Sequence, residues 1–379
     1  MSVEWDIEQL HQIPRTYPAG GFRSEGIEAL FYDGLPWRGK PTRVFTWLGM
    51  PALEEGERCP GIVLVHGGGG TAFDSWVRLW NERGYAAIGM DLCGCVPEPQ
   101  PIPPGGERAR HEWGGPPGWG GFEQMDEAAE DQWTYQAVGA IGLGHSLLAA
   151  QPQVDAERIG ITGISWGGYL TCIAAGVDAR SRFAVSVYGC GFLGENSAWK
   201  QDVLARMGED KRKRWLAQWD PAVYLPRAEM PFCWVTGTND FAYPLDSLQK
   251  SHRLTAGEKT ICVRVEMPHG HGGAGENPEE IRAFADSHLQ GGEALTRVMG
   301  QRFENDRLWA TFESARPIVR AELNFTRAEG FWPDRKYNIL PATIEEGRVD
   351  AEVPPMTTVC FLNLFDDRNC AVSTEFVEP

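Results

Sequence analysis

The sequence predicts an α/β fold with a mostly parallel sheet flanked by helices, followed by a small C-terminal all-β sandwich domain. Short apolar runs alternate with helical patterns through the first 290 residues of the 379-residue chain, as in βαβ units. The run at 61–65 is apolar throughout, which a strand buried on both faces requires. After Gly291 and Gly292, polar and apolar residues alternate instead, so we expect one domain over 1–292 and a second over 293–379.

Hydrophobic periodicity defines the strands and helices of the first domain. Two β segments joined by a turn with glycine and proline come before the buried run, and another apolar strand follows it. Strands are predicted where short apolar runs occur, at 26–32, 42–48, 61–65, 85–92, 158–162, 183–188, 232–236 and 260–267. Helices are predicted where apolar residues recur at helical spacing, at 72–83, 127–150, 169–175 and 279–289.

Two segments interrupt this alternation. Residues 96–124 contain seven prolines and seven glycines, so they resist regular structure, and their aromatic residues favour an ordered loop over the mouth of a site. Trp113 and Trp119 in this loop are candidate substrate-binding residues. We expect residues 189–226 to form a small lid or side insertion. Its helical stretches are 197–207 and 210–219.

The alternation after residue 292 predicts β-strands with turn residues between them. The run Asp-Asp-Arg-Asn at 366–369 is typical of a hairpin turn. No helical segment is evident in this region, so we expect a sandwich of immunoglobulin or fibronectin type. Its predicted strands are 307–313, 319–325, 348–353, 357–364 and 370–377.

The overall charge argues against one class of partner. The formal net charge is −17, and nucleic-acid backbones bind cationic surfaces, so no nucleic-acid partner is expected. The chain has no run of about 18 apolar residues, and residues 1–12 lack the pattern of a signal peptide. We therefore expect a cytoplasmic protein with no membrane partner, although a chain with its leader trimmed would look the same. The nine scattered cysteines fit free buried thiols in a reducing compartment.

A Gly-x-Ser-x-Gly pattern at 163–167 is the main candidate for a reactive centre. It follows the apolar strand 158–162 and precedes the helical pattern 169–175, so Ser165 stands at a sharp strand-to-helix turn. Glycine two residues before and after the serine leaves room for the neighbouring backbone. A serine exposed in this way acts as a nucleophile, which needs a histidine base, an acid that orients the base, and N–H donors for the oxyanion.

The acid and the base should follow later strands, in the chain order serine, acid, histidine. Asp240 follows one such strand and is the candidate acid, and Asp246, at or inside the next helix, is the alternative. His269 and His271 both follow the last strand, in the run Pro-His-Gly-His-Gly. His269 is favoured because it is nearer to the strand end, and His271 stays open as the alternative base. No cluster of further ligands accompanies the two histidines, so no metal is expected.

Two backbone N–H groups are needed to bind the oxyanion. One comes from the residue after the nucleophile, here Trp166, and the other from a glycine-rich loop after an early strand. That loop is the run His-Gly-Gly-Gly-Gly at 66–70. Gly67, Gly68 and Gly69 are the candidate donors, with Gly68 preferred, because glycine lets the backbone approach the substrate.

These motifs, together with the lead-in Val-Asp-Ala-Glu-Arg-Ile-Gly at 154–160, resemble those of α/β-hydrolases in the dienelactone hydrolase, acetyl xylan esterase and prolyl oligopeptidase-like grouping. The resemblance covers roughly residues 24–290 and does not include the β-rich tail. It implies the α/β-hydrolase fold, with Ser165 as nucleophile, Asp240 as acid and His269 or His271 as base. The sequence departs from the grouping in one respect, since a single histidine is usual at the base position.

The resemblance implies two-step acyl transfer through an acyl-enzyme on Ser165, with no cofactor. We expect hydrolysis of carboxylic esters, with deacetylation of carbohydrate esters as the narrower form, because several of the fifteen tryptophans flank the site and aromatic faces stack on sugar rings. A prolyl oligopeptidase-like peptidase is one alternative, which is disfavoured because the segment before the oxyanion loop is too short for a propeller domain. A non-catalytic binding or scaffold protein is the other. The expected partner is a small-molecule or carbohydrate ester, and a homo-oligomer stays open.

Overall fold

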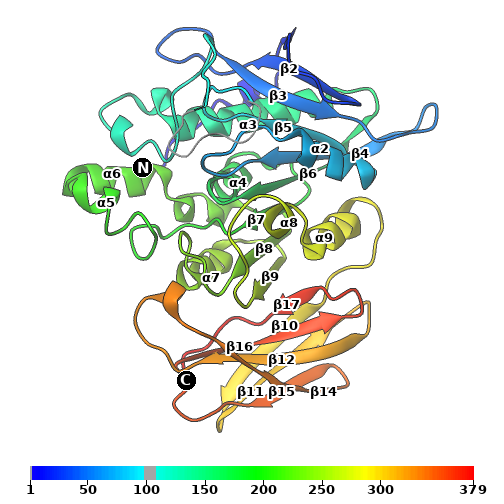
Figure 1. Cartoon of the computed structure of the whole chain (residues 1–379), viewed down its shortest axis with the longest axis vertical. Coiled ribbons are helices and arrows are strands. Elements are labelled where there is room, and N and C mark those ends of the chain that lie inside the picture. The colour runs from blue at the N-terminus through cyan, green and yellow to red at the C-terminus, as the bar shows by residue number, and fades with distance from the viewer. Residues whose placement is uncertain (1, 98–107) are drawn as a thin grey trace.

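The described chain folds around one large sheet. The computed structural model describes residues 2–97 and 108–379, and residues 98–107 of the expected Pro/Gly-rich loop lie outside this part. The described residues form a nine-stranded sheet in the order β1-β2-β3-β5-β4-β6-β7-β8-β9 (Figure 1). The strands are β1 (Thr16–Pro18), β2 (Ile27–Asp33), β3 (Arg43–Gly49), β4 (Cys59–Val65), β5 (Ala86–Met90), β6 (Val154–Ile164), β7 (Ala184–Val187), β8 (Phe232–Gly237) and β9 (Lys259–Arg264).

Most of this sheet is parallel, as the sequence predicts. Strands β5, β4, β6, β7, β8 and β9 run parallel to one another. Strands β1, β2 and β3 form an antiparallel end that joins the rest through β3 and β5. Every residue of β4, β5, β7 and β8 is buried, because these strands are covered on both faces. The predicted α/β fold is therefore confirmed.

Side chains that alternate along the strands face two separate cores. In β4, Ile62 and Leu64 face one core and Val63 and Val65 face the other, as the two-residue period of a strand dictates. The first core is covered by α2 (Asp74–Glu82) and α9 (Glu279–Leu289). The second is covered by α3 (Trp133–Ala149), α4 (Trp166–Val177) and α7 (Leu245–Leu254). The result is a three-layer arrangement of helices, sheet and helices (Figure 1).

The segments between these elements carry short helices. The helix α6 (Glu209–Trp219) agrees with the predicted stretch 210–219. Its Trp215 Nε1–H donates to the Gly120 carbonyl at 2.8 Å, so the side insertion packs on the Pro/Gly-rich loop. The other short helices are α1 (Ile7–Leu10), α5 (Val203–Arg206) and α8 (Gly273–Glu276), with 3₁₀ turns at Phe122–Gln124, Ala129–Asp131, Pro221–Val223 and Leu225–Arg227.

Two helices begin later than the sequence predicts. The helix expected over 127–150 begins at Trp133, because a 3₁₀ turn precedes it and the Gln124 side chain accepts the Trp133 N–H at 2.6 Å. The helix expected over 197–207 begins at Val203, because the Ser197 hydroxyl bonds to neighbouring backbone groups instead. In both places a polar side chain competes with the helix for backbone partners.

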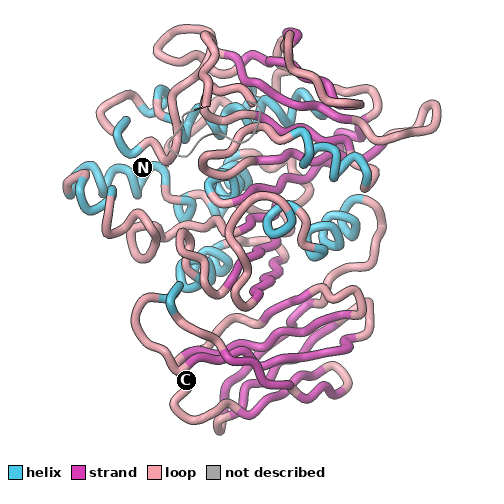
Figure 2. The backbone as a smooth tube through the Cα atoms, viewed as in Figure 1, coloured by secondary structure: helices cyan, strands magenta, loops and turns pink. Residues whose placement is uncertain are grey.

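The C-terminal part is an antiparallel β-sandwich. Its described residues form two four-stranded sheets, β10-β11-β15-β14 and β13-β12-β16-β17, and Figure 2 shows the strands of this part gathered apart from the large sheet. The two sheets enclose a hydrophobic core of their own. The predicted turn at 366–369 joins β16 to β17. Strand β10 begins at Arg297, and the division of the chain into domains at residue 292 stays a prediction. The strands are β10 (Arg297–Glu304), β11 (Arg307–Glu313), β12 (Ile318–Thr326), β13 (Asn338–Pro341), β14 (Thr343–Glu345), β15 (Arg348–Glu352), β16 (Val359–Asp366) and β17 (Ala371–Ser373), with a 3₁₀ turn at Trp332–Asp334.

Side chains of the sandwich form hydrogen bonds with backbone groups of β9, at the outer edge of the large sheet. Strand β17 packs beside β9, the last strand in the sheet order (Figure 1). The Val263 N–H donates to Ser373 Oγ at 2.8 Å, and the Val263 carbonyl accepts from Asn363 Nδ2 at 2.9 Å. An uncovered edge strand pairs readily with other chains, so these contacts protect β9.

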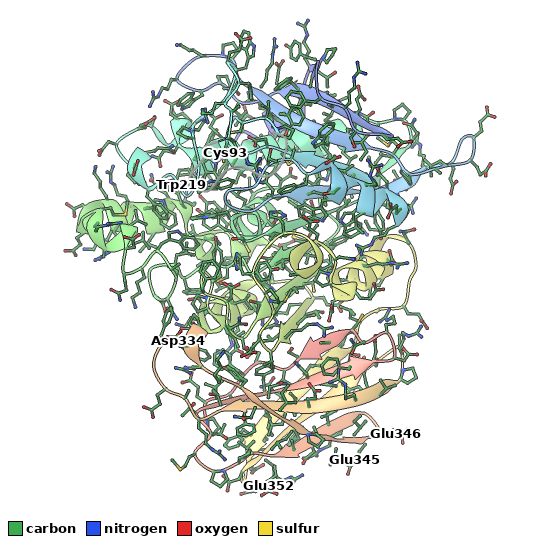
Figure 3. The ribbon with its side chains drawn as sticks, viewed as in Figure 1. Cys93, Trp219, Asp334, Glu345, Glu346 and Glu352 are labelled. Carbon is green, nitrogen blue, oxygen red and sulfur yellow. The ribbon has the colours of Figure 1, made fainter. Side chains whose placement is uncertain are left out.

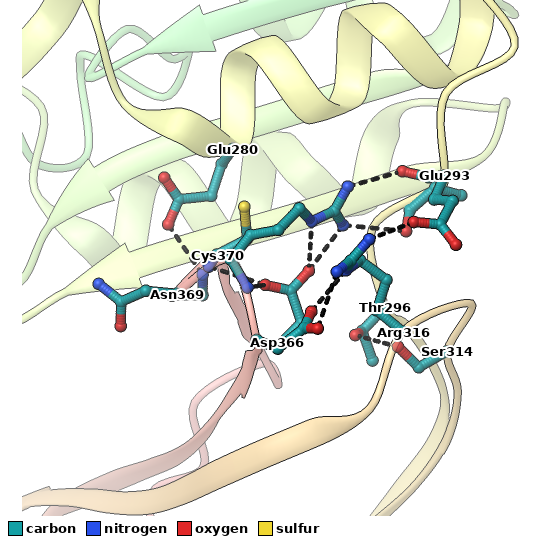
Figure 4. A network of polar contacts seen from close by, with 12 residues as sticks. Glu280, Glu293, Thr296, Ser314, Arg316, Asp366, Asn369 and Cys370 are labelled. Carbon is teal, nitrogen blue, oxygen red and sulfur yellow. Dashed lines mark hydrogen bonds and ion pairs between the residues drawn. The ribbon is translucent and has the colours of Figure 1, made fainter.

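A buried carboxylate connects α9 to the sandwich (Figure 4). Glu280, with 1% of its side chain exposed, accepts the Ala371 N–H at 2.8 Å and pairs with Arg264. Nearby, the Arg316 guanidinium pairs with Glu293 of the connecting segment. Because a buried carboxylate is costly without partners, these contacts fix the two parts of the chain against each other.

The surface and the cysteines agree with the composition. Figure 3 shows the exposed residues Glu345, Glu346 and Glu352 at the outer end of the sandwich, away from the large sheet. All nine cysteines are buried thiols. Among residues 2–97 and 108–379, no helix is both long enough and apolar enough to cross a bilayer.

Candidate active site

Ser165 occupies a strained turn between β6 and α4. Its φ of 58° and ψ of −118° lie in a region that non-glycine residues rarely adopt, and its N–H donates to the Val187 carbonyl at 2.8 Å. A Cβ atom at Gly163 would collide with the Gly167 backbone, and one at Gly167 would collide with the Val65 carbonyl. The turn therefore requires both glycines of the motif.

His269 bridges Ser165 and Asp240. Its Nε2 lies 2.9 Å from Ser165 Oγ, and its Nδ1 lies 2.6 Å from Asp240 Oδ2. A carboxylate can only accept, so Nδ1 carries the imidazole proton and Nε2 is left to accept from the serine hydroxyl. The structure thus brings together the three residues that the sequence predicts, at the carboxyl ends of three parallel strands.

Backbone donors hold the Asp240 carboxylate in place. Its Oδ1 accepts the Ala242 N–H at 3.0 Å and the Tyr243 N–H at 2.7 Å, and the residue is 2% exposed. Asp246, the alternative acid, accepts from Asn196 Nδ2 at 2.9 Å instead. The first turn of α7 thus directs Asp246 to another partner, and the hydrogen bond to His269 is made by Asp240 instead.

Two aromatic residues that the sequence analysis missed flank the histidine. The Tyr188 ring stacks on His269 with 4.4 Å between centroids, and its hydroxyl donates to the Gly270 carbonyl at 3.1 Å. Burial raises the pKa of Tyr188, so the phenol stays protonated and keeps this bond. Phe241, which is 60% exposed, also contacts His269, with 4.8 Å between the ring centroids. The position of Tyr188 directly after β7 was the signal that could have identified it.

His271 does not contact Ser165 and is not placed as its base. Its Nε2 accepts the Gly67 N–H at 2.9 Å, and its Nδ1 lies 3.0 Å from Glu276 Oε1. Both nitrogens of His271 therefore have partners other than Ser165, and the Gly67 N–H, one of the candidate oxyanion donors, already has an acceptor.

Gly68 and Trp166, two of the remaining candidate oxyanion donors, lie beside the serine turn. A Cβ at Gly68 would lie 2.6 Å from Trp166 Cδ1, and one at Gly67 would lie 3.1 Å from Ser165 Cβ, so the glycine loop lies directly against the nucleophile. Trp166 is the first residue of α4, where the N–H has no acceptor within the helix. Neither N–H has a hydrogen bond with another described residue.

A buried neutral histidine supports the glycine loop. His66 Nδ1–H donates to the Gly67 carbonyl at 3.0 Å, and His66 Nε2 accepts the Leu92 N–H at 3.1 Å. Burial lowers the pKa of His66 to about 4, so both bonds persist at neutral pH. The sequence placed His66 in this loop but gave it no role.

The two tryptophans predicted to bind substrate lie in different surroundings. Trp119 packs on the His66 ring with 5.4 Å between centroids. Trp113, which is 37% exposed, stacks on the Arg43 guanidinium at 4.4 Å. Trp119 therefore reaches the glycine loop, whereas Trp113 contacts the start of β3. A third residue, Trp199, which the sequence places among the tryptophans that flank the site, packs on Trp166 with 4.5 Å between ring centroids.

No metal centre accompanies these residues in the part of the chain that is described. Among residues 2–97 and 108–379, no group of three or more His, Cys, Asp or Glu side chains could hold an ion. The arrangement instead offers a hydroxyl next to an imidazole and a buried carboxylate on the other ring nitrogen, with the glycine loop packed against the serine turn. A mostly parallel sheet with a serine at the turn after β6 is the arrangement of α/β-hydrolases, and fold and site together define this class of protein.

Comparison with known families agrees with this class. Residues 122–290 match the prolyl oligopeptidase family, and residues 29–199 match the acetyl xylan esterase family. Each match covers less than half of the chain, and the two together support an α/β-hydrolase grouping. No curated protein matches the sequence significantly.

Solved structures show the same fold at low sequence identity. The acetyl xylan esterase from Paenibacillus sp. R4 is 21% identical, with a TM-score of 0.55 over 75% of this chain and 92% of that one. Acetyl xylan esterase 1 from Thermoanaerobacterium sp. JW/SL YS485 is 18% identical, with a TM-score of 0.53 over 76% and 93%. The acylaminoacyl peptidase of Pyrococcus horikoshii is 21% identical, with a TM-score of 0.51 over 70% of this chain and 42% of its own length.

Proposed function

We propose that the protein is a serine hydrolase that cleaves carboxylic esters through an acyl-enzyme on Ser165. The observation that carries the proposal is the hydrogen-bonded series in which His269 joins Ser165 Oγ at 2.9 Å to Asp240 at 2.6 Å. Nucleophile, base and orienting acid stand within hydrogen-bond reach of one another, which is the geometry that acyl transfer needs.

In the acylation step, Ser165 Oγ attacks the ester carbonyl carbon while His269 Nε2 takes the serine proton. Asp240 holds the proton on Nδ1 and stabilises the imidazolium that forms. The carbonyl oxygen becomes an oxyanion, which the N–H groups of Gly68 and Trp166 bind. Collapse of this intermediate breaks the bond to the alcohol oxygen, and His269 returns the proton to the departing alcohol.

In the deacylation step, water takes the place of the alcohol. His269 removes a proton from the water as its oxygen attacks the acyl carbon, and the same two N–H groups bind the second oxyanion. The bond to Ser165 Oγ then breaks, His269 returns the proton to the serine, and the carboxylic acid leaves. Both steps use only groups of this chain and water.

We further propose acetylated carbohydrates as the substrate class. The acetyl xylan esterase match includes the glycine loop and Ser165, and two similar structures are acetyl xylan esterases. Trp119 contacts His66 of the glycine loop and Trp199 contacts Trp166, so aromatic rings of the kind that stack on sugars lie close to Ser165. The sandwich at 293–379 is proposed as a separate domain that supports the edge of the catalytic sheet.

A peptidase of prolyl oligopeptidase type is the second candidate, and a specific observation favours it. The match to that family spans residues 122–290 and includes Ser165, Asp240 and His269 together. Because the same three residues serve both reactions, only the substrate separates the two proposals.

Hydrolysis of model substrates tests the proposal. We expect turnover of p-nitrophenyl acetate that Ser165→Ala abolishes and that Ser287→Ala, in α9, leaves unchanged. Acetylated xylo-oligosaccharides should give a higher kcat/KM than p-nitrophenyl butyrate. A dipeptidyl p-nitroanilide turned over faster than any ester would favour the peptidase, and ester turnover that survives Ser165→Ala would refute the mechanism.

A further inference from the structure

His271 connects the loop that carries His269 to the glycine loop. Its Nε2 accepts the Gly67 N–H at 2.9 Å, and its Nδ1 lies 3.0 Å from Glu276 Oε1. The amide can only donate and the carboxylate accepts, so in the neutral ring Nδ1 carries the proton. Glu276 therefore selects the tautomer that leaves Nε2 free to accept from Gly67.

Packing holds the His271 ring in this orientation. Its centroid lies 4.6 Å from that of Phe73 and 5.7 Å from that of Trp76, and 21% of the side chain is exposed. Glu276 is 11% exposed. A side chain held by two rings and two hydrogen bonds is ordered enough to fix the position of the backbone group it accepts from.

Hydrogen bonds hold both of the peptide groups that flank Gly67. The Gly67 N–H is held by His271, and the Gly67 carbonyl accepts from His66 Nδ1–H at 3.0 Å and from the Gly70 N–H at 3.0 Å. Because the peptide bond is planar and trans, the Gly68 N–H points in the direction opposite to the Gly67 carbonyl. The direction of the proposed oxyanion donor therefore depends on both bonds.

We propose that His271 is a positioning residue, which holds the Gly67–Gly68 peptide so that the Gly68 N–H meets the oxyanion, while Glu276 fixes its tautomer. The inference rests on the proposed ester hydrolysis at Ser165. Gly67 has no side chain to restrict its rotation, so loss of the acceptor at Nε2 frees its φ angle. The Gly68 N–H then spends less time at about 2.7–3.1 Å from the position of the oxyanion, which is the distance that such a donor needs.

Three variants separate positioning from proton transfer. His271→Leu removes the acceptor, and His271→Gln restores one, since the glutamine Oε1 can occupy the place of Nε2. His269→Gln is the matched control, because glutamine cannot act as a base. With p-nitrophenyl acetate we expect His271→Leu to lower kcat by about 10–100-fold with KM changed less than about threefold, His271→Gln to recover most of kcat, and His269→Gln to lose at least about 10³-fold.

Two kinetic outcomes would overturn the inference. If His271→Leu keeps the wild-type kcat, the bond to Gly67 has no role in the reaction. If His271→Leu and His271→Gln are both as damaging as His269→Gln, then His271 transfers protons rather than positions the loop. Circular dichroism of each variant identifies any loss of activity that comes from unfolding.

The tautomer of His271 provides a readout that does not depend on turnover. In protein labelled with ¹⁵N-histidine, two-bond ¹⁵N–¹H correlation spectra at pH 7 should show His271 as the Nδ1–H tautomer, with His271→Gln used to assign its signals. A Glu276→Leu variant should lose this preference, and its kcat should fall in the same direction as that of His271→Leu. An Nε2–H tautomer in the wild type would overturn the inference even if ester hydrolysis is established, and the Nδ1–H tautomer together with activity that survives Ser165→Ala would refute the proposed function alone.

Discussion

Replacing Gly68 by alanine should disable the oxyanion site without removing any catalytic group. The new Cβ would lie 2.6 Å from Trp166 Cδ1 and 3.4 Å from Trp166 Nε1. The indole cannot rotate away easily, because Trp166 is 5% exposed and packs on Trp199 and Tyr169 at 4.5 and 4.9 Å. The glycine loop must therefore retreat from the serine turn.

The size of the effect follows from this displacement. Ordinary contact between the two carbons needs about 3.5 Å, so the loop moves by roughly 1 Å, which takes the Gly68 N–H out of reach of the oxyanion. Loss of one donor costs about 2.7–4 kcal/mol of transition-state stabilisation, so kcat should fall by about 10²–10³-fold. KM should change little, because the donor acts on charge that develops only in the transition state.

Steady-state kinetics with p-nitrophenyl acetate check this prediction. The matched control is Gly273→Ala in α8, where a Cβ would meet nothing within 4 Å, and its kcat should equal that of the wild type. Thermal unfolding shows whether each variant is folded. A folded Gly68→Ala enzyme with wild-type kcat would refute the assignment of Gly68 as a donor.

Three further predictions concern the acid Asp240, the buried His145, and Glu280, which connects α9 to the sandwich. Asp240→Asn should lower kcat by about 10⁴-fold at pH 7, measured by the same assay, because the amide favours the wrong tautomer of the base. Burial lowers the pKa of His145 from 6.5 to about 4. As the pH falls, the imidazole therefore becomes protonated in the unfolded chain at a higher pH than in the folded chain. The free energy of unfolding should fall between about pH 6.5 and pH 4, by up to about 3 kcal/mol. Urea unfolding of His145→Leu should show a weaker loss over this range, and an unchanged loss would contradict the assignment. Glu280→Ala should lower the free energy of unfolding by about 2 kcal/mol, since its partner Arg264 is partly exposed, whereas Glu279→Ala on the same helix should cost less than about 0.5 kcal/mol.

The main elements of the site could be predicted because they depend on local patterns. Ser165, Asp240 and His269 each follow a recognisable apolar strand, and the carboxyl ends of parallel strands meet at one edge of a sheet. The chain order of the three residues then removed most alternatives. Fully buried strands such as β4 carry a strong signal, since both faces must be apolar.

The partners of His271 could not be predicted, because they depend on contacts between distant segments. His269 and His271 lie two residues apart in one loop, and the sequence favours His269 as the base only because it is nearer to the strand end. His271 contacts Gly67 from 204 positions away, and that contact also decides which glycine keeps a free N–H. Only the packing of the two loops settles these choices.

The strands that were missed lie at sheet edges or on open faces. Every residue of β13 and β14 is exposed, so neither strand has the apolar alternation that marks a half-buried strand. Strand β1 has three residues, too few to show a pattern. Strand β10 has no fully buried residue, and its polar sequence hides the two-residue period.

Covalent labelling of the nucleophile tests the central claim most directly. The protein is treated with a fluorophosphonate at pH 7, and the modified residue is located by peptide mass spectrometry. Phosphonylation should occur at one site, Ser165, and should be lost in Ser165→Ala and strongly slowed in His269→Gln, but not lost in His271→Gln. Labelling of a different residue, or ester hydrolysis by Ser165→Ala at the wild-type rate, would contradict the account.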